Sequence, residues 1–158
     1  MEKKKLLLTK FTDLRLSANS DVDALQQIYK AGISSGVMKE SWLAAALERE
    51  EHSPTGLPTL VSVAIPHTDA EHALVDGIGF FRLEEQVEFG EMGSLDAKIP
   101  VKIVIPLLIT DPKAQLDLLM TVISLVQNES VMTELIQLND IEQIANVIDR
   151  FVASEEPS

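Results

Sequence analysis

The chain has 158 residues, of which 46% are hydrophobic and 24% charged, and these values predict one globular domain. It contains no cysteine, which excludes disulfides and thiol chemistry. The 13 Lys plus Arg against 25 Asp plus Glu give a formal charge of −12, which argues against nucleic-acid binding because it would repel a phosphate backbone.

No signal peptide and no membrane span are predicted. The opening stretch MEKKKLLLTKFTD has an apolar run that is too short for a signal peptide. The uncharged apolar stretch at residues 118–128 reaches only roughly half of a membrane span. We therefore expect a soluble, cytoplasmic protein.

Two helices are predicted in the first third of the chain. Residues 20–35 have the spacing of an amphipathic helix, with Ser20 as its N-cap and Gly36 as its terminator. Residues 39–51 are rich in strong helix formers, and this places Arg49 in the last turn of a second helix.

Three strands are predicted next, at residues 60–65, 77–83 and 98–109, because each run is rich in branched apolar residues. The third is almost wholly apolar, which is typical of a central strand buried on both faces. Pro106 lies inside it and indicates a bulge or an early end.

A helix is predicted to follow these strands. Asp111 is the expected N-cap and Pro112 the first helical residue. The expected buried face comprises Leu116, Leu119, Met120, Ile123 and Val126.

The C-terminal part predicts two short helices, at residues 129–138 and 140–151, the second capped by Asn139. We expect the domain to span residues 1–153 and residues 154–158 to form a tail. Helices at both ends around a group of strands indicate a single-domain α/β fold, since each apolar strand face has to be covered.

The histidine at the end of the first predicted strand is the main candidate for chemistry. The residue before a proline favours extended backbone, so Pro66 should end the strand and His67 should emerge at its terminus. Strand ends are where α/β folds present reactive groups. His67 is therefore a base, a metal ligand or a nucleophile, or else a histidine that simply hydrogen-bonds at a strand end.

Metal and nucleotide chemistry have weaker sequence support. The stretch HTDAEH offers His67, Asp69, Glu71 and His72, but a catalytic zinc site needs three well-placed ligands and this spacing is not typical of one. The glycine-rich motifs that cradle nucleotides do not occur, and no cofactor is predicted. Phosphoryl chemistry fits better, because a neutral imidazole nitrogen can attack phosphorus.

An ordered set of motifs surrounds His67. It comprises RE at 49–50, PTG at 54–56, VAIPH at 63–67, and then PVKIVIPLLIT and DPKAQLDLLMTVISLV. In this order the motifs resemble the enzyme IIA components of the bacterial phosphoenolpyruvate-dependent sugar phosphotransferase system, of the fructose/mannitol class, over about residues 24–151. The resemblance implies a mixed β-sheet flanked by helices on both faces.

The resemblance also implies a function as a phosphotransferase component. His67 would accept phosphate from the phosphohistidine of the carrier HPr and pass it to a cysteine of a IIB component. The membrane permease IIC would then import the sugar as it is phosphorylated.

Further site residues follow from the same resemblance. Arg49 matches the family's arginine, whose guanidinium suits phosphate oxygens, although a solvated helix-end arginine is the alternative. Thr55 and Gly56 match a loop that could add hydrogen-bond donors for the phosphate, or that could be a plain turn.

Gln115 stands where fructose and mannitol members commonly carry a second histidine. Its amide could donate to the phosphate or orient the His67 ring. This glutamine and His72 resemble the galactitol-type branch, so we expect uptake of galactitol or a related sugar, with His72 either assisting electrostatically or facing solvent. His52 is expected to be a surface residue.

Two other functions stay open at this point. Nitrogen-type IIA relatives use the same phosphohistidine to control partner proteins. A metal-dependent enzyme built on His67, Asp69 and His72 is the third possibility.

Overall fold

The computed structural model describes residues 5–155, and within this range the chain forms one mixed sheet of six strands. The strand order is β1-β4-β5-β3-β2, and β6 pairs with β4. The pairs β1–β4 and β3–β5 are parallel and the others antiparallel. The strands are β1 (Leu7–Leu16), β2 (Gly56–Leu57), β3 (Val63–Ala64), β4 (Gly77–Gly90), β5 (Lys98–Val104) and β6 (Leu107–Leu108).

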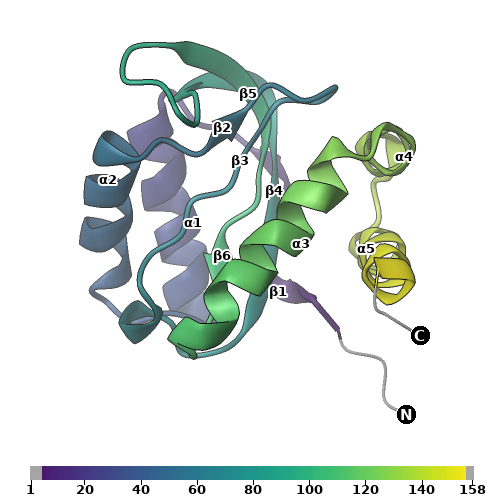
Figure 1. The fold of residues 1–158 in the computed structure, drawn as a ribbon, viewed down its shortest axis with the longest axis horizontal. Coiled ribbons are helices and arrows are strands. Elements are labelled where there is room, and N and C mark those ends of the chain that lie inside the picture. Colours follow the sequence, from purple (N-terminus) through teal and green to yellow (C-terminus); the bar gives the residue numbers. More distant parts are fainter. Residues whose placement is uncertain (1–4, 156–158) are drawn as a thin grey trace.

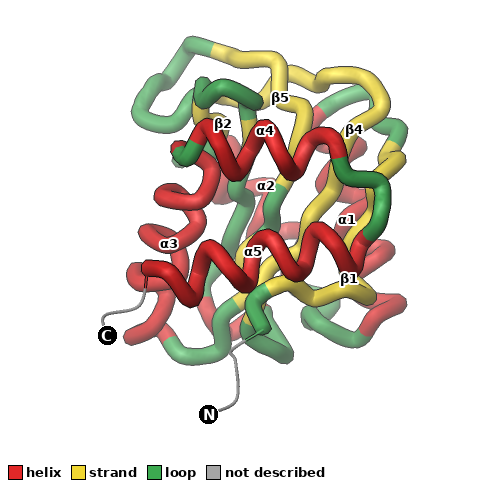
Figure 2. The backbone as a smooth tube through the Cα atoms, turned by 90° about the vertical axis from the view of Figure 1, so that its right-hand side faces the viewer, coloured by secondary structure: helices red, strands yellow, loops and turns green. Residues whose placement is uncertain are grey.

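Helices cover both faces of this sheet, which confirms the predicted architecture. Figure 1 shows α1 and α2 on one side and α3, α4 and α5 on the other, and Figure 2 looks onto the second group. No helix within residues 5–155 combines the length and the apolar character needed to cross a membrane. The helices are α1 (Asp21–Ser35), α2 (Trp42–His52), α3 (Gln115–Gln127), α4 (Glu129–Gln137) and α5 (Ile141–Glu155), with short 3₁₀ turns η1 (Ala70–His72) and η2 (Pro112–Ala114).

Each face of the sheet has its own apolar core. Beneath α1 and α2, Trp42 is fully buried, and the rings of Phe11 and Phe81 pack edge to face with centroids 5.0 Å apart. Beneath α3, α4 and α5, the core contains Ile65 and Ile103. Burial on both faces of the sheet fixes the strand ends that carry the site.

The two N-terminal helices form where the sequence predicts them. Ser20 caps α1 by accepting a hydrogen bond from the backbone N–H of Asp23, and Gly36 ends the helix in the left-handed conformation, at φ 72°. Helix α2 begins at Trp42, three residues later than expected, and Arg49 lies in its last turn as predicted.

The strands differ from the prediction in length and number. Of residues 60–65 only Val63–Ala64 form a strand, and β4 continues seven residues beyond the expected end. Strand β1 was not predicted. Its pattern is weak because residues on both of its faces are partly exposed.

The third predicted strand is central, but it is interrupted at the position that Pro106 indicated. β5 ends at Val104, and β6 resumes the antiparallel pairing with β4 after the break. Pro106 has no N–H to donate, and its carbonyl accepts a hydrogen bond from Gly79 N.

Helix α3 is preceded by the 3₁₀ turn η2, in which the Asp111 side chain accepts from Lys113 N. Its buried face differs from the predicted one. The buried side chains are Val122, Leu125 and Val126, whereas Leu116 is 66% exposed and Met120 54% exposed. The helix therefore presents apolar side chains to solvent.

The expected cap of the last helix is wrong. Asp140, rather than Asn139, accepts from the N–H of Gln143, and the Asn139 side chain instead accepts from Arg82. The helix includes Ser154 and Glu155, so the first two residues of the predicted tail are helical. The rest of that tail, residues 156–158, lies outside the described residues.

Candidate active site around His67

His67 lies three residues beyond β3, on backbone that stays bonded to the neighbouring chain segment. The N–H of Ile105 donates to Ala64 O at 2.8 Å, and the N–H of Leu107 donates to Pro66 O at 3.0 Å. The sequence folds this way because Pro66 ends the strand while its carbonyl still accepts a hydrogen bond. The peptide that carries the imidazole is thereby fixed.

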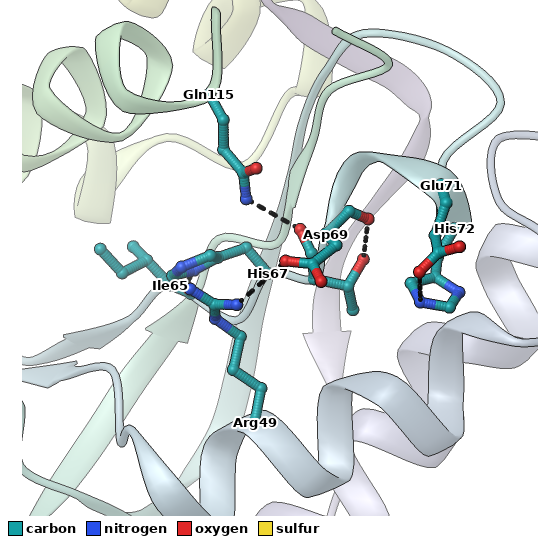
Figure 3. A network of polar contacts seen from close by, with 8 residues as sticks. Arg49, Ile65, His67, Asp69, Glu71, His72 and Gln115 are labelled. Carbon is teal, nitrogen blue, oxygen red and sulfur yellow. Dashed lines mark hydrogen bonds and ion pairs between the residues drawn. The ribbon is translucent and has the colours of Figure 1, made fainter. Parts of the chain in front are cut away.

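One hydrogen bond sets the tautomer of the His67 ring. Nδ1 lies 2.8 Å from the carbonyl oxygen of Ile65 (Figure 3). A carbonyl only accepts, so Nδ1 carries the proton. Nε2, on the other side of the ring, then keeps its lone pair and can act as a nucleophile.

The environment keeps this imidazole neutral. Burial lowers the pKa of His67 below the ordinary 6.5, and the positive charge of Arg49 lowers it further, while the Ile65 carbonyl and Asp69 act in the opposite direction. The side chain is only 8% exposed. A neutral ring is the form that can attack phosphorus.

A hollow of about 420 Å³ lies over His67. Helix α2 contributes Arg49 and His52, helix α3 contributes Leu119, and the loop from β4 to β5 contributes residues 92–95. His52 is exposed, as the sequence predicted, but its place on the wall of this hollow was not foreseen. No sequence signal marks it, because the hollow is closed by a loop about forty residues further along the chain.

Arg49 reaches toward the hollow from the end of α2 (Figure 3). Its Nη1 lies 3.4 Å from Oδ1 of Asp69, and both side chains are well exposed. An exposed ion pair of this length contributes little stability. The guanidinium can therefore exchange Asp69 for an incoming anion at small cost.

Gln115, the first residue of α3, approaches from the opposite side (Figure 3). Its amide Nε2 donates to the carbonyl oxygen of Thr68 at 2.8 Å. Gln115 thus holds the backbone next to His67, whereas orientation of the imidazole ring was one of its two predicted roles.

Thr55 lines the same hollow as His67, and Gly56 pairs with Ala64 of β3, but both residues already make contacts within the fold. The Thr55 hydroxyl is buried, donates to the Glu50 carboxylate and accepts from Ile65 N. At Gly56 a Cβ would lie 2.5 Å from the carbonyl oxygen of Gly90, so only glycine fits this close approach. The Thr55 hydroxyl therefore has no proton left to donate to a phosphate, which was its predicted role.

His72 does not line the hollow around His67. Its Nδ1 lies 2.7 Å from Ser41 Oγ, and its Nε2 lies 3.5 Å from a Glu71 carboxylate oxygen. Within the described part of the chain no three His, Asp or Glu side chains are grouped to hold a metal ion. The geometry therefore separates His72 from His67.

A neutral histidine beside an exposed arginine, on a mixed sheet covered by helices, is the arrangement expected of a protein that carries a phosphoryl group on histidine. The model of the family described as "Phosphoenolpyruvate-dependent sugar phosphotransferase system, EIIA 2" matches residues 5–151. The chain belongs to this family, whose members are phosphotransferase components that work through a histidine.

Several known proteins are similar to the chain. It is 30% identical to the galactitol-specific EIIA component of Escherichia coli strain K12 over 121 residues. These residues are 76% of this chain and 80% of the relative. The IIA of a solved complex with phosphorylated mannitol IIB, also from E. coli, gives a TM-score of 0.72 at 19% identity, covering 90% of this chain and 98% of that one. The nitrogen regulatory IIA protein of Neisseria meningitidis gives a TM-score of 0.68 at 19% identity. The match covers 90% of this chain and 96% of that one.

The tautomer and the pKa of His67 are open to direct measurement. We expect a titration followed by ¹⁵N NMR to show a proton on Nδ1 of the neutral ring and a midpoint below 6.5, because burial penalises the charged form. A proton on Nε2, or a midpoint at or above the ordinary histidine value, would contradict the site described here.

Proposed function

We propose that the chain is a phosphocarrier in which His67 accepts phosphate from the phosphohistidine of HPr and passes it to a cysteine of a IIB component. A membrane IIC permease then imports galactitol or a related sugar, and the chain acts at the cytoplasmic side. The observation that carries the proposal is the hydrogen bond from Nδ1 to Ile65 O, because it leaves the Nε2 lone pair for the phosphorus.

The chemistry requires no cofactor. Nε2 forms a bond to phosphorus while the phosphorus–nitrogen bond to the donor histidine breaks, and the donor ring keeps the electron pair. In the second step a IIB thiolate attacks the same phosphorus, and the electron pair returns to Nε2. Each step needs positioning and charge stabilisation more than an acid or a base.

Arg49 is the cation proposed to stabilise the transferring group. It lines the same hollow as His67 and its present partner, Asp69, is an exposed carboxylate. A planar guanidinium matches two phosphate oxygens at once, and the contact strengthens as charge spreads in the transition state.

An apolar rim beside the hollow supports docking of a protein partner. Leu95 is 93% exposed on the loop from β4 to β5 and lines the hollow. Leu116 is exposed on the same face of α3 as Leu119, which lines the hollow, and the adjacent Met120 is exposed as well. Large apolar side chains gathered at a reactive group indicate a surface that another protein covers during transfer.

Sugar transport is favoured over regulation. The galactitol-specific relative shares 30% identity over most of the chain, whereas the nitrogen regulatory protein shares 19% and shows a common fold only. Gln115 supports the same choice, since the resemblance associates glutamine at this position with the galactitol-type branch.

Phosphate transfer to the purified chain tests the proposal. Incubation with phosphoenolpyruvate, enzyme I and HPr should add one acid-labile phosphate to the intact mass, and a galactitol-type IIB should remove it. His67→Ala should take up none, while His72→Ala, changed outside the hollow, should still be labelled. A wild-type chain that stays unmodified would contradict the proposal.

Arg49→Ala should slow phosphate uptake by about 100-fold, because a charge-assisted contact to the transferring group is lost. The melting temperature should hardly change, since the ion pair with Asp69 is exposed. Rapid-quench measurement of the labelling rate checks this, with Arg150→Ala as the matched control, because Arg150 forms an exposed pair with Glu134 on the other side of the sheet. Equal rates for wild type and Arg49→Ala would make Arg49 a surface residue.

A further inference from the structure

A buried carboxylate lies behind His67 and has no part in the transfer described above. Glu50 follows Arg49 in the last turn of α2, yet it is only 8% exposed. Its Oε1 accepts from Thr55 N at 2.8 Å and from Thr55 Oγ1 at 3.0 Å, and its Oε2 lies 3.0 Å from the same hydroxyl. Every polar contact found for this carboxylate leads to Thr55.

The hydrogen bonds continue from Thr55 to the imidazole. Because the Thr55 hydroxyl has one proton and donates it to Glu50, its lone pairs are free to accept, and one accepts from Ile65 N at 3.1 Å. The carbonyl of the same residue, Ile65, accepts from Nδ1 of His67 at 2.8 Å. The carboxylate is thereby linked to the His67 ring through one hydroxyl and one residue of backbone.

We propose that Glu50 and Thr55 are positioning residues for phosphoryl transfer, with the ionised carboxylate orienting the hydroxyl that holds Ile65, whose carbonyl fixes the His67 ring with Nε2 toward the hollow. This inference rests on the proposed function of His67. It gives a role in transfer to the glutamate of RE and the threonine of PTG, beyond the backbone N–H groups of Thr55 and Ile65 that they satisfy.

The protonation state of Glu50 decides whether this chain of hydrogen bonds is complete. An ionised carboxylate only accepts, which suits the two donors of Thr55, whereas a protonated one brings a donor of its own and competes for the hydroxyl lone pairs. Burial raises the pKa of Glu50 from 4.5 to about 7, although the hydrogen bonds from Thr55 oppose the rise and the charge of Asp21 adds to it.

Charged groups from three elements and one loop line a second hollow of about 390 Å³ together with Glu50. They are Asp21 of α1, Glu51 of α2, Asp96 of the loop before β5, and Lys98 of β5. Among these groups, the negative charge of Asp21 favours the protonated form of Glu50. As the pH falls through about 7, the carboxylate takes up a proton and the support of Ile65 weakens. Protonation of His67 itself follows only at lower pH, because its pKa lies below 6.5.

The test compares rates of phosphate uptake from phospho-HPr across a range of pH from about 5 to about 9. Glu50→Gln and Thr55→Val should each slow uptake by about ten- to a hundredfold, since a small misplacement of the reacting atom is costly. Thr55→Ser should restore most of the rate lost in Thr55→Val. Glu51→Gln, changed at the exposed neighbour, is the control for altered charge.

The pH profile separates positioning from a merely structural role. Wild type and Glu51→Gln should lose rate below a midpoint near pH 7, whereas Glu50→Gln should lack this limb and keep only the lower one that belongs to His67. Rates and profiles of Glu50→Gln and Thr55→Val that match wild type would overturn the proposal. If Glu50→Gln does not fold, Thr55→Val and Thr55→Ser decide the matter alone. Failure of the proposed function is distinct, because wild type would then take up no phosphate at any pH.

Discussion

The hydrogen bond from His67 Nδ1 to the carbonyl of Ile65 is the interaction on which the site depends. It settles which nitrogen carries the proton, and so it settles where a phosphoryl group can attach. The bond joins residues only two apart in sequence, and it forms because Pro66 turns the chain while the backbone on either side stays paired with the segment after β5. The mixed sheet therefore fixes the position of the imidazole to which we assign the transfer chemistry.

Burial and reactivity are balanced around this histidine. The ring is largely buried, which keeps it neutral, yet it lines a hollow bordered by Arg49 and the exposed Leu95. Polar groups beneath the ring are satisfied within the protein, through Thr55 and Glu50 on one side and Gln115 with Thr68 on the other. The side chains around the hollow can thus contact a partner, while the interior hydrogen bonds hold the backbone that carries His67.

Local rules predicted much of this from the sequence. The cap at Ser20, the end at Gly36, the break at Pro106 and the exit of His67 after Pro66 all follow from backbone preferences of single residues. The misses involve contacts and packing that no local sequence pattern specifies. Strand β1 is defined by its pairing with β4, the outward turn of Leu116 by the way α3 packs, and the use of Thr55 by a glutamate that folding brings beneath it.

The nitrogen of His67 that carries the phosphate tests the account most directly. With ¹⁵N-labelled histidine, NMR of the phosphorylated protein distinguishes attachment at Nε2 from attachment at Nδ1. The proposed site predicts attachment at Nε2, because Nδ1 donates to the Ile65 carbonyl. Phosphate on Nδ1 of His67, or on His52 or His72, would contradict the account.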